Sequence, residues 1–366
     1  MNVVGVDVGG ANLKASDGRT VSVSLPFELW KQPEQLPNAL RDLVSTVCPQ
    51  ADVSVVATMT GELADCFASK EEGVNRIVDA LQFATPSNRL RVYLTDGRIV
   101  AANEAREAFR LAAASNWHVM ASFLARGFST RPPRPPERLA IMLDVGSTTC
   151  DLIPLRHGQV ASQGRTDTAR LQAGELLYMG VERTPLCGIT TLVPYRGHPC
   201  PLACELFATT GDVYLTLGEL PENEANRATA DRRPATRPFA QARLARAICA
   251  DVEAFDEGDA LCLAHDIASK QAQLLAVAID RLFTRMTAES CSAERPLANA
   301  ATDDDAALLV TGHGDFLVRR AVACCSWRPA QIRYGVEELG AAAARVGPAY
   351  ALAALVHATP EWFETS

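Results

Sequence analysis

Two short segments of the sequence carry the residue types that point most clearly to chemistry. Residues 5–18 read GVDVGGANLKASDG and residues 142–158 read MLDVGSTTCDLIPLRHG, and each has an apolar run that ends in Asp-Val-Gly. The aspartates are Asp7 and Asp144, and after each of them the chain turns through glycine toward a second apolar run. Two copies of one strand-turn-strand pattern predict two similar hairpins, although unrelated hairpins that share these letters are the alternative.

The turn of each hairpin is suited to binding an anion. Glycine lets a phosphate oxygen approach the main chain, and the N–H groups of such a turn point into the space beyond the strand. The aspartates would repel phosphate but hold Mg²⁺, which would neutralise the phosphate charge. We therefore predict that Asp7 and Asp144 are catalytic metal ligands at a phosphate site. The predicted binding residues are Gly9, Gly10, Asn12, Gly146, Ser147, Thr148 and Thr149.

Two further features could contribute to the same site. Lys14 lies where the first hairpin turns back, and it fits either a catalytic phosphate contact or a solvated strand lysine. Late in the chain, LLVTGHGDFL (308–317) is an apolar strand that breaks at Gly312 and Gly314. These glycines would let a phosphorylated or flat group lie against the backbone, although G-x-G alone is a weak signal. We interpret His313, between them, as a turn residue rather than a base.

Composition indicates the class of protein. The chain has 366 residues, of which 48% are apolar and 21% charged, which is typical of a globular enzyme with two domains. Its net charge of −8 argues against sequence-independent nucleic-acid binding, which needs a concentrated basic surface. Because the first residues read as a strand without a positively charged segment or cleavage site, we expect no secretion signal. We also expect no membrane-spanning segment, and the 11 scattered cysteines do not suggest a disulfide framework. These features predict a cytoplasmic protein.

The order of predicted elements favours an α/β protein with two domains. Strands alternate with helices over 1–130, and the second Asp-Val-Gly hairpin opens a domain over 138–339 with an irregular insertion around 180–240. Between the two domains, the proline-rich segment RGFSTRPPRPPERL (126–139) predicts a linker. The small-residue helix near 340–366 is expected to pack back on the first domain.

Helical spacing gives three more local predictions. We expect one continuous helix over 102–126 and one long helix over 258–286. Glu205 and Asp212 lie seven residues apart in ELFATTGD, so on a helix they would share one face. Such a pair could hold a metal or belong to a solvated stripe.

The two hairpins and the late glycine turn together resemble the superfamily of sugar kinases, heat-shock proteins and actin. The resemblance implies an α/β fold in which two ribonuclease-H-like domains face each other across a cleft that binds a nucleotide or phosphate. The likeness is closer in TMTGELADCFASKEEGVNRIVDAL, GELLYMGVERTPLC and ADRRPATRPFAQARLARAICAD. With these stretches the chain resembles the hydantoinase/oxoprolinase-related branch, and within it the condensing enzymes of methanofuran or methylofuran synthesis, which accompany tetrahydromethanopterin-linked one-carbon metabolism.

This resemblance implies an unusual transferase reaction. The family enzyme joins an aminomethyl-furanmethanol diphosphate to the phenol of a tyramine- or tyrosine-derived partner, forming an ether and releasing diphosphate. Mg²⁺ or a similar divalent cation would then stabilise the leaving diphosphate. The matching motifs suggest Glu62, Asp65 and Asp151 as candidates for the base that takes the phenol proton. Lys70 and Arg183 could contact an anionic substrate, although an ordinary surface arginine is the favoured interpretation of Arg183.

Two other functions remain open from the sequence. An ATP-dependent small-molecule kinase or a hydantoinase/oxoprolinase-like hydrolase would use the same fold, and a scaffold that binds a phosphorylated ligand would catalyse nothing. The chain is shorter than hydantoinase and oxoprolinase subunits, and its GHGDF turn is poorer than the adenosine-binding turn of the kinases. Both features argue against use of ATP. The sequence leaves the identity of the phenol open and is compatible with a homo-oligomer.

Overall fold

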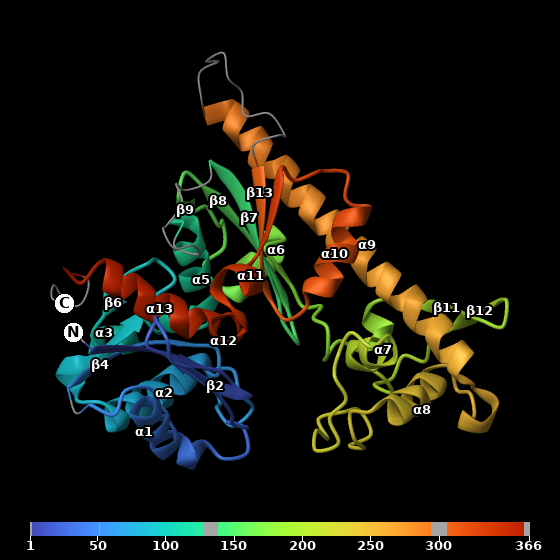
Figure 1. Cartoon of the computed structure of the whole chain (residues 1–366), viewed down its shortest axis with the longest axis horizontal. Coiled ribbons are helices and arrows are strands. Elements are labelled where there is room, and N and C mark those ends of the chain that lie inside the picture. The colour runs from blue at the N-terminus through green and yellow to red at the C-terminus, as the bar shows by residue number, and fades with distance from the viewer. Residues whose placement is uncertain (1, 51, 128–137, 294–305, 362–366) are drawn as a thin grey trace.

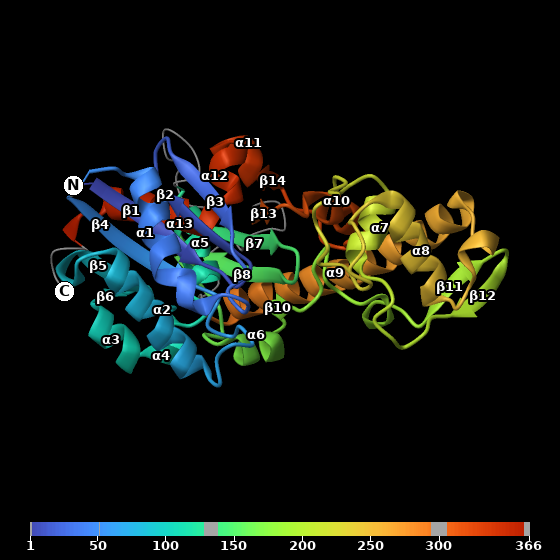
Figure 2. The ribbon, with the colours of Figure 1, turned by 90° about the horizontal axis from the view of Figure 1, so that it is seen from below.

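The computed structural model describes residues 2–50, 52–127, 138–293 and 306–361, and structural statements below refer to these residues. They form two six-stranded sheets and a two-stranded ribbon, with helices around and between the sheets (Figure 1). Seen from below, the N-terminal sheet lies at one end of the molecule and the two-stranded ribbon at the other (Figure 2). The predicted proline-rich linker falls mostly outside the described residues.

The first sheet is built from the N-terminal part of the chain. In spatial order its strands are β3 (Ser22–Pro26), β2 (Asn12–Ser16), β1 (Asn2–Val8), β4 (Val53–Met59), β5 (Leu90–Tyr93) and β6 (Ile99–Val100). The pairs β1–β2 and β2–β3 are antiparallel, whereas β1–β4 and β4–β5 are parallel. Strands β1 and β4 are almost entirely buried, and for this reason they read as nearly continuous apolar runs.

The second sheet repeats this arrangement. Its strands are β10 (Leu176–Leu177), β8 (Cys150–Arg156), β7 (Leu139–Val145), β13 (Ala306–Gly312) and β14 (Gln331–Tyr334), and β9 (Gln159–Val160) also pairs with β8. Strands β7, β8 and β9 form an antiparallel meander, and β7, β13 and β14 are parallel. A meander followed by two parallel strands is thus present twice. The prediction of an α/β fold with two ribonuclease-H-like halves is confirmed.

The first half has five helices among its described residues, of which the first two connect strands of its sheet and the other three follow its last strand. The five helices are α1 (Leu36–Val47), α2 (Lys70–Ala84), α3 (Ala102–Glu107), α4 (Phe109–Ala112) and α5 (Asn116–Ala125). The continuous helix predicted over 102–126 is wrong, because the chain breaks after α3 and again after α4. At the second break Ala114 has a φ of 48°, in the left-handed region, which a continuing right-handed helix excludes.

Helices of the second half surround its sheet and build the insertion. They are α6 (Asp167–Ala173), α7 (Thr210–Thr216), α8 (Arg237–Ala247), α9 (Glu257–Ala293), α10 (Asp315–Cys324), α11 (Gly335–Leu339), α12 (Ala341–Arg345) and α13 (Gly347–Ala358). Strands β11 (Leu192–Tyr195) and β12 (His198–Pro201) form the ribbon. The predicted long helix is present as α9, longer than expected. Among the described residues, none of the helices combines the length and apolar character needed to cross a bilayer.

Helices α5 and α13 form a layer between the two sheets. One buried apolar cluster contains residues of both helices together with the facing strands of both sheets. Helix α13 approaches β1 so closely that a Cβ placed on Gly5 would lie 2.0 Å from the carbonyl oxygen of Ala349. Small residues on both elements allow this approach. The C-terminal helix therefore fixes the first sheet relative to the second.

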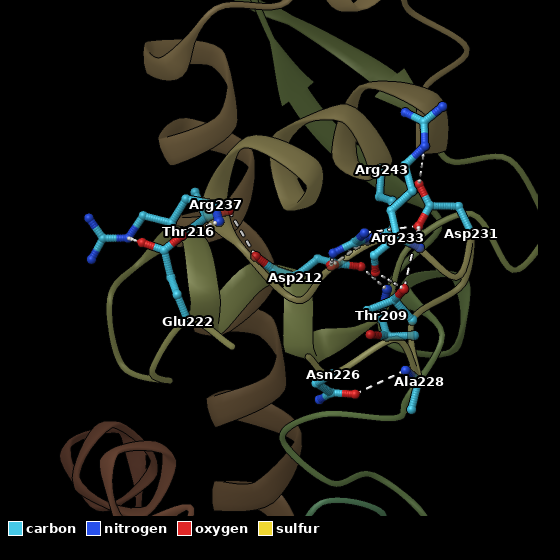
Figure 3. Close-up of polar contacts among 11 residues, drawn as sticks. Thr209, Asp212, Thr216, Glu222, Asn226, Ala228, Asp231, Arg233, Arg237 and Arg243 are labelled. Atoms are coloured by element: carbon cyan, nitrogen blue, oxygen red, sulfur yellow. Dashed lines mark hydrogen bonds and ion pairs between the residues drawn. The ribbon is translucent and has the colours of Figure 1, made fainter. Parts of the chain in front are cut away.

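A buried ion-pair network holds the insertion together (Figure 3). The side chain of Arg243, on α8, is fully buried. Its Nε–H donates to Asp212 Oδ1 at 2.7 Å, and its Nη1 donates to Asp231 Oδ1 at 2.9 Å. Asp212 Oδ2 accepts a hydrogen bond from the backbone N–H of Thr209, the N-cap of α7. The predicted sharing of one helix face by Glu205 and Asp212 is wrong, because Glu205 precedes α7 and Asp212 binds Arg243.

Candidate active site

The two Asp-Val-Gly segments form hairpin corners with the same backbone geometry. In the first corner, the N–H of Gly9 donates to the carbonyl of Asn12 at 3.0 Å. In the second corner, the N–H of Gly146 donates to the carbonyl of Thr149 at 2.9 Å. The strands that follow are also in the same register, since Asp7 pairs with Lys14 as Asp144 pairs with Asp151. The sequence repeat is therefore a structural repeat.

Backbone N–H groups at both corners are available to a ligand. Within the described part of the chain, the N–H groups of Gly10, Ser147 and Thr148 have no hydrogen-bond partner. The carbonyls of Ser147 and Thr148 are occupied, because they accept hydrogen bonds from the segment 180–183. The segment 180–183 thus holds the turn in place, while the N–H groups of Ser147 and Thr148 stay free. Free backbone N–H groups at turns of this kind can bind anions.

The side-chain charges place the aspartates of both corners within electrostatic reach of one lysine. Lys14 Nζ lies 3.4 Å from Asp7 Oδ2. Burial raises the pKa of Asp7, and the Lys14 ammonium partly lowers it again. Burial and the charge of Asp151 raise the pKa of Asp144 to about 6, and the same Lys14 ammonium opposes that shift. Because Lys14 acts on one aspartate from each corner, the corners lie within electrostatic reach of each other.

The two corners differ in charge. At the position where the first corner has Lys14 opposite Asp7, the second corner has Asp151 opposite Asp144. In the first corner Lys14 neutralises Asp7, whereas in the second corner Arg170 is paired with Asp151 and Asp144 has no ion-pair partner among the described residues. A divalent cation would gain most at the second corner.

A third wall of the site comes from the turn after β13. A Cβ on Gly312 would lie 2.6 Å from Asp144 Oδ1, and Gly312 has a φ of 82°. The N–H of Gly314 donates to the carbonyl of Val145 at 3.0 Å. Only glycine allows the chain to pass so close to Asp144 at this positive φ. The predicted glycine turn thus packs directly against the second corner.

The residues present fit a magnesium ion. Asp7 Oδ1 is buried and has no hydrogen-bond partner among the described residues, and such an oxygen is stabilised by a cation. No group of three or more Asp, Glu, His or Cys side chains able to hold a metal occurs in the described ranges. Mg²⁺ commonly binds through one or two carboxylates and takes its remaining ligands from water and substrate phosphates. The aspartates of the two corners match that mode.

Two predicted residues, Asp151 and Lys70, lie in a neighbouring charge network. Asp151 Oδ1 accepts a hydrogen bond from Arg170, and Oδ2 accepts one from Thr149 at 3.5 Å. With both oxygens engaged, Asp151 is poorly placed to take a proton from a substrate. Lys70 Nζ, on α2, lies 3.7 Å from Asp167 Oδ2, on α6, and so joins the two halves of the chain. Asp167 also pairs with Arg170 at 3.5 Å, so Lys70 is connected to Asp151 through ion pairs and has no direct ion pair with an aspartate of either corner among the described residues.

Among the three base candidates, Glu62 has the most unusual environment. Its side chain is 1% exposed, and its Oε2 has no hydrogen-bond partner among the described residues. Burial raises the pKa of Glu62 to about 7, against the lowering effect of the Lys70 ammonium. The nearby charges that affect it are Lys70 and Asp167, not the corner aspartates. Asp65, the third candidate, is exposed on the same loop.

In wild type, we expect the free energy of unfolding to fall as the pH rises, because Glu62 loses its proton. Glu62→Gln should abolish this pH dependence. The pKa of Glu62 rises from 4.5 to about 7 on folding, so the folded state binds the proton more tightly. The stabilisation is present below pH 4.5 and is lost as pH rises through 7, which between pH 5 and 8 amounts to about 2–3 kcal/mol. In urea unfolding, the free energy of unfolding of wild type should fall by that amount from pH 5 to pH 8. The variant should not show this decrease. Asp65→Asn is the exposed control, and equal pH profiles for wild type and Glu62→Gln would contradict the assignment.

Sequence reasoning missed one pair at the site. Glu182 Oε1 lies 2.7 Å from His313 Nε2, and the imidazole is close enough to Asp144 to affect its pKa, which it lowers. Arg183, which the sequence suggested, has an exposed side chain, and its backbone N–H binds the carbonyl of Ser147. Glu182 and His313 lie far apart in the sequence, and only the glycines on either side of His313 indicated a special position.

Comparison with known proteins places the chain among relatives. The hydantoinase/oxoprolinase family profile matches residues 54–321. The (4-{4-[2-(gamma-L-glutamylamino)ethyl]phenoxymethyl}furan-2-yl)methanamine synthase of Methanocaldococcus jannaschii, here called the furan-methanamine synthase, is 30% identical over 288 residues, covering 77% of this chain and 82% of the relative. The synthase of the same name from Methanococcus vannielii is 33% identical over 128 residues, covering 35% of this chain and 57% of that relative.

Solved structures with low sequence identity also align along the chain. The ROK hexokinase from Thermus thermophilus has 17% identity and a TM-score of 0.45, covering 98% of this chain and 100% of its own. The activator of the 2-hydroxyisocaproyl-CoA dehydratase from Clostridium difficile has 12% identity and a TM-score of 0.43, covering 100% and 97%. Because both TM-scores are below 0.5, we base the fold class on the strand order that the two sheets share. By sequence, the chain belongs to the hydantoinase/oxoprolinase family, in the branch of the furan-methanamine synthases, as its motifs predict.

Proposed function

We propose that this chain is a synthase that forms an aryl–alkyl ether in furan cofactor synthesis and releases diphosphate. Its relatives are named as enzymes that make a phenoxymethyl-furan methanamine, a product in which an ether oxygen joins an aromatic ring to a furan-bound carbon. The observation that carries the proposal is that two corners with free backbone N–H groups lie within electrostatic reach of the same Lys14. Two such corners suit a diphosphate, which has a phosphoryl group for each.

The reaction exchanges one carbon–oxygen bond for another. The phenol loses its proton to a base, and its oxygen forms a bond to the furan-bound methylene carbon. The bond from that carbon to the diphosphate oxygen breaks, and diphosphate leaves with the electron pair. A furan ring stabilises positive charge on the adjacent carbon by resonance, so the main task of the protein is to stabilise the negative charge of the leaving group.

The residues of the corners divide this task. The free N–H groups of Gly10, Ser147 and Thr148 would bind the phosphoryl oxygens, and Lys14 would add a positive charge between the corners. Asp144, with Asp7, would hold Mg²⁺ or a similar divalent cation. When bound, the cation neutralises charge on the leaving diphosphate.

The test is a reaction with defined substrates. Purified protein, Mg²⁺, the aminomethyl-furanmethanol diphosphate and γ-glutamyltyramine, tyramine or tyrosine should yield the ether by mass spectrometry and one equivalent of diphosphate. The O-methylated phenol, which has no proton to lose and no free nucleophile, is the matched control and should give no ether. The reaction should not need ATP. Absence of ether with every phenol, or turnover of ATP to ADP coupled to a substrate, would favour the kinase or hydrolase alternative.

A further inference from the structure

The turn after β13 places an imidazole beside the second corner. His313 lies between Gly312, which packs against Asp144, and Gly314, the N-cap of α10. The backbone on either side is therefore fixed against the corner. The His313 side chain is 50% exposed, so it remains accessible to a small molecule.

Glu182 is the partner of this imidazole and is held firmly by its own backbone. The N–H of Glu182 donates to the carbonyl of Ser147 at 3.0 Å, and its carbonyl accepts from the N–H of Gly211 at 3.0 Å. Its side chain is 39% exposed, and Oε1 lies 2.7 Å from His313 Nε2. The same residue thus supports the anion-binding turn and orients the imidazole.

The partner determines which ring nitrogen can take a proton. An ionised carboxylate can only accept hydrogen bonds, so the hydrogen between the two side chains belongs to His313 Nε2. Nδ1 then carries the lone pair. A histidine whose N–H is held by a carboxylate is the arrangement that enzymes use for general base catalysis, because the carboxylate fixes the tautomer and stabilises the protonated ring.

We propose that His313, oriented by Glu182, is the base that accepts the phenol proton through Nδ1, an inference that rests on the proposed function. As the phenol O–H bond breaks, its electron pair remains on the oxygen that bonds to the furan-bound carbon. The proton moves to Nδ1, and diphosphate departs with the electrons of its bond to carbon. His313 later returns the proton to solvent.

The other carboxylates at the site are less suited to this step. Asp151 has both oxygens engaged, and Glu62 is only 1% exposed, whereas the His313 side chain is 50% exposed and open to a substrate. Asp144 is assigned to the cation. His313 is the basic group that the fold places beside Asp144 with one ring nitrogen oriented and the other unoccupied among the described residues.

The test compares His313→Gln and Glu182→Gln across phenols of increasing acidity, such as tyramine derivatives with successive ring fluorines. With the unsubstituted phenol, His313→Gln should lower kcat roughly 10²- to 10⁴-fold, the usual contribution of a general base. The loss should shrink as the phenol becomes more acidic, because a phenolate needs no base. Glu182→Gln should show a smaller loss with the same trend. His265→Gln, an exposed histidine on α9, is the matched control.

The outcomes separate this inference from the proposed function. If wild-type protein forms no ether, the proposed function fails. If wild-type protein forms ether and His313→Gln matches it, or if the loss is the same for every phenol, His313 is not the base and only this inference fails. Inhibition of each variant by added diphosphate reports on the binding site separately, and we expect it to stay close to wild type.

Discussion

Asp144→Asn should lower kcat for ether formation at least roughly 100-fold, the effect typical of removing a group that stabilises charge developing in a transition state. The expectation follows from the asymmetry of the corners. Arg170 is paired with Asp151, which leaves Asp144 without an ion-pair partner among the described residues, so Asp144 is the carboxylate that a divalent cation would bind and the asparagine variant would hold that cation weakly. The activity of the variant should therefore need much more Mg²⁺.

Asp7→Asn is the matched comparison for this prediction. Lys14 already neutralises Asp7, so the loss of its charge should change the Mg²⁺ dependence less. Titration of kcat with Mg²⁺ for wild type and both variants distinguishes the two positions. Equal shifts for Asp7→Asn and Asp144→Asn, or wild-type activity of Asp144→Asn, would contradict the assignment of the cation to the second corner.

Arg243→Ala should produce the largest loss of folding stability among single changes in the insertion. Arg243 is fully buried between Asp212 and Asp231, and the Asp212 side chain is only 3% exposed. Removing the guanidinium would leave a buried carboxylate without its cation, which typically costs about 3–5 kcal/mol. Burial already raises the pKa of Asp212, and Arg243 is the main group that lowers it.

Arg237→Ala on the same helix is the control for stability. The Arg237 side chain is 59% exposed, and its Nε lies 4.0 Å from Glu222 Oε1, with which it is drawn in Figure 3. An exposed pair of this kind contributes about 0–1 kcal/mol. Thermal or urea unfolding should therefore separate the two variants clearly. Similar unfolding midpoints would mean that the network around Arg243 does not stabilise the insertion.

Loss of Arg243 should also disturb the turn of the second corner, because α7 is hydrogen-bonded to the segment that supports this turn. Asp212 caps α7 together with Thr209, and the hydroxyl of Thr210 donates to the carbonyl of Gly180 at 2.9 Å. The N–H of Gly180 in turn binds the carbonyl of Thr148, in the second corner. The insertion is thereby connected to the anion-binding turn by a continuous series of hydrogen bonds.

Local sequence signals were sufficient to predict the corners. Both buried strands that end in Asp-Val-Gly make the same hydrogen bond at the turn, so Asp7 and Asp144 occupy the same position in their hairpins. The long helix α9 and the tightly packed α13 were also predictable, because both depend on periodicity and small side chains.

The rest of the site depends on contacts that periodicity does not reveal. The predicted helix over 102–126 breaks at Ala114, where tertiary packing overrides good local propensity. The pair of Glu182 and His313 forms only because β13 lies next to β7 and the segment 180–183 binds the second corner. His313 was interpreted as a turn residue because its neighbours are glycines. Its backbone does lie in a turn, but the contact of its side chain with Glu182 was not predicted.

The most direct test of the account is a crystal structure of the protein grown with diphosphate and with Mn²⁺ in place of Mg²⁺, so that anomalous scattering locates the metal. The account predicts diphosphate between the corners, within hydrogen-bond distance of the N–H groups of Gly10, Ser147 and Thr148, and a manganese peak at Asp144. Diphosphate bound elsewhere, with both corners free of ligand, would contradict it.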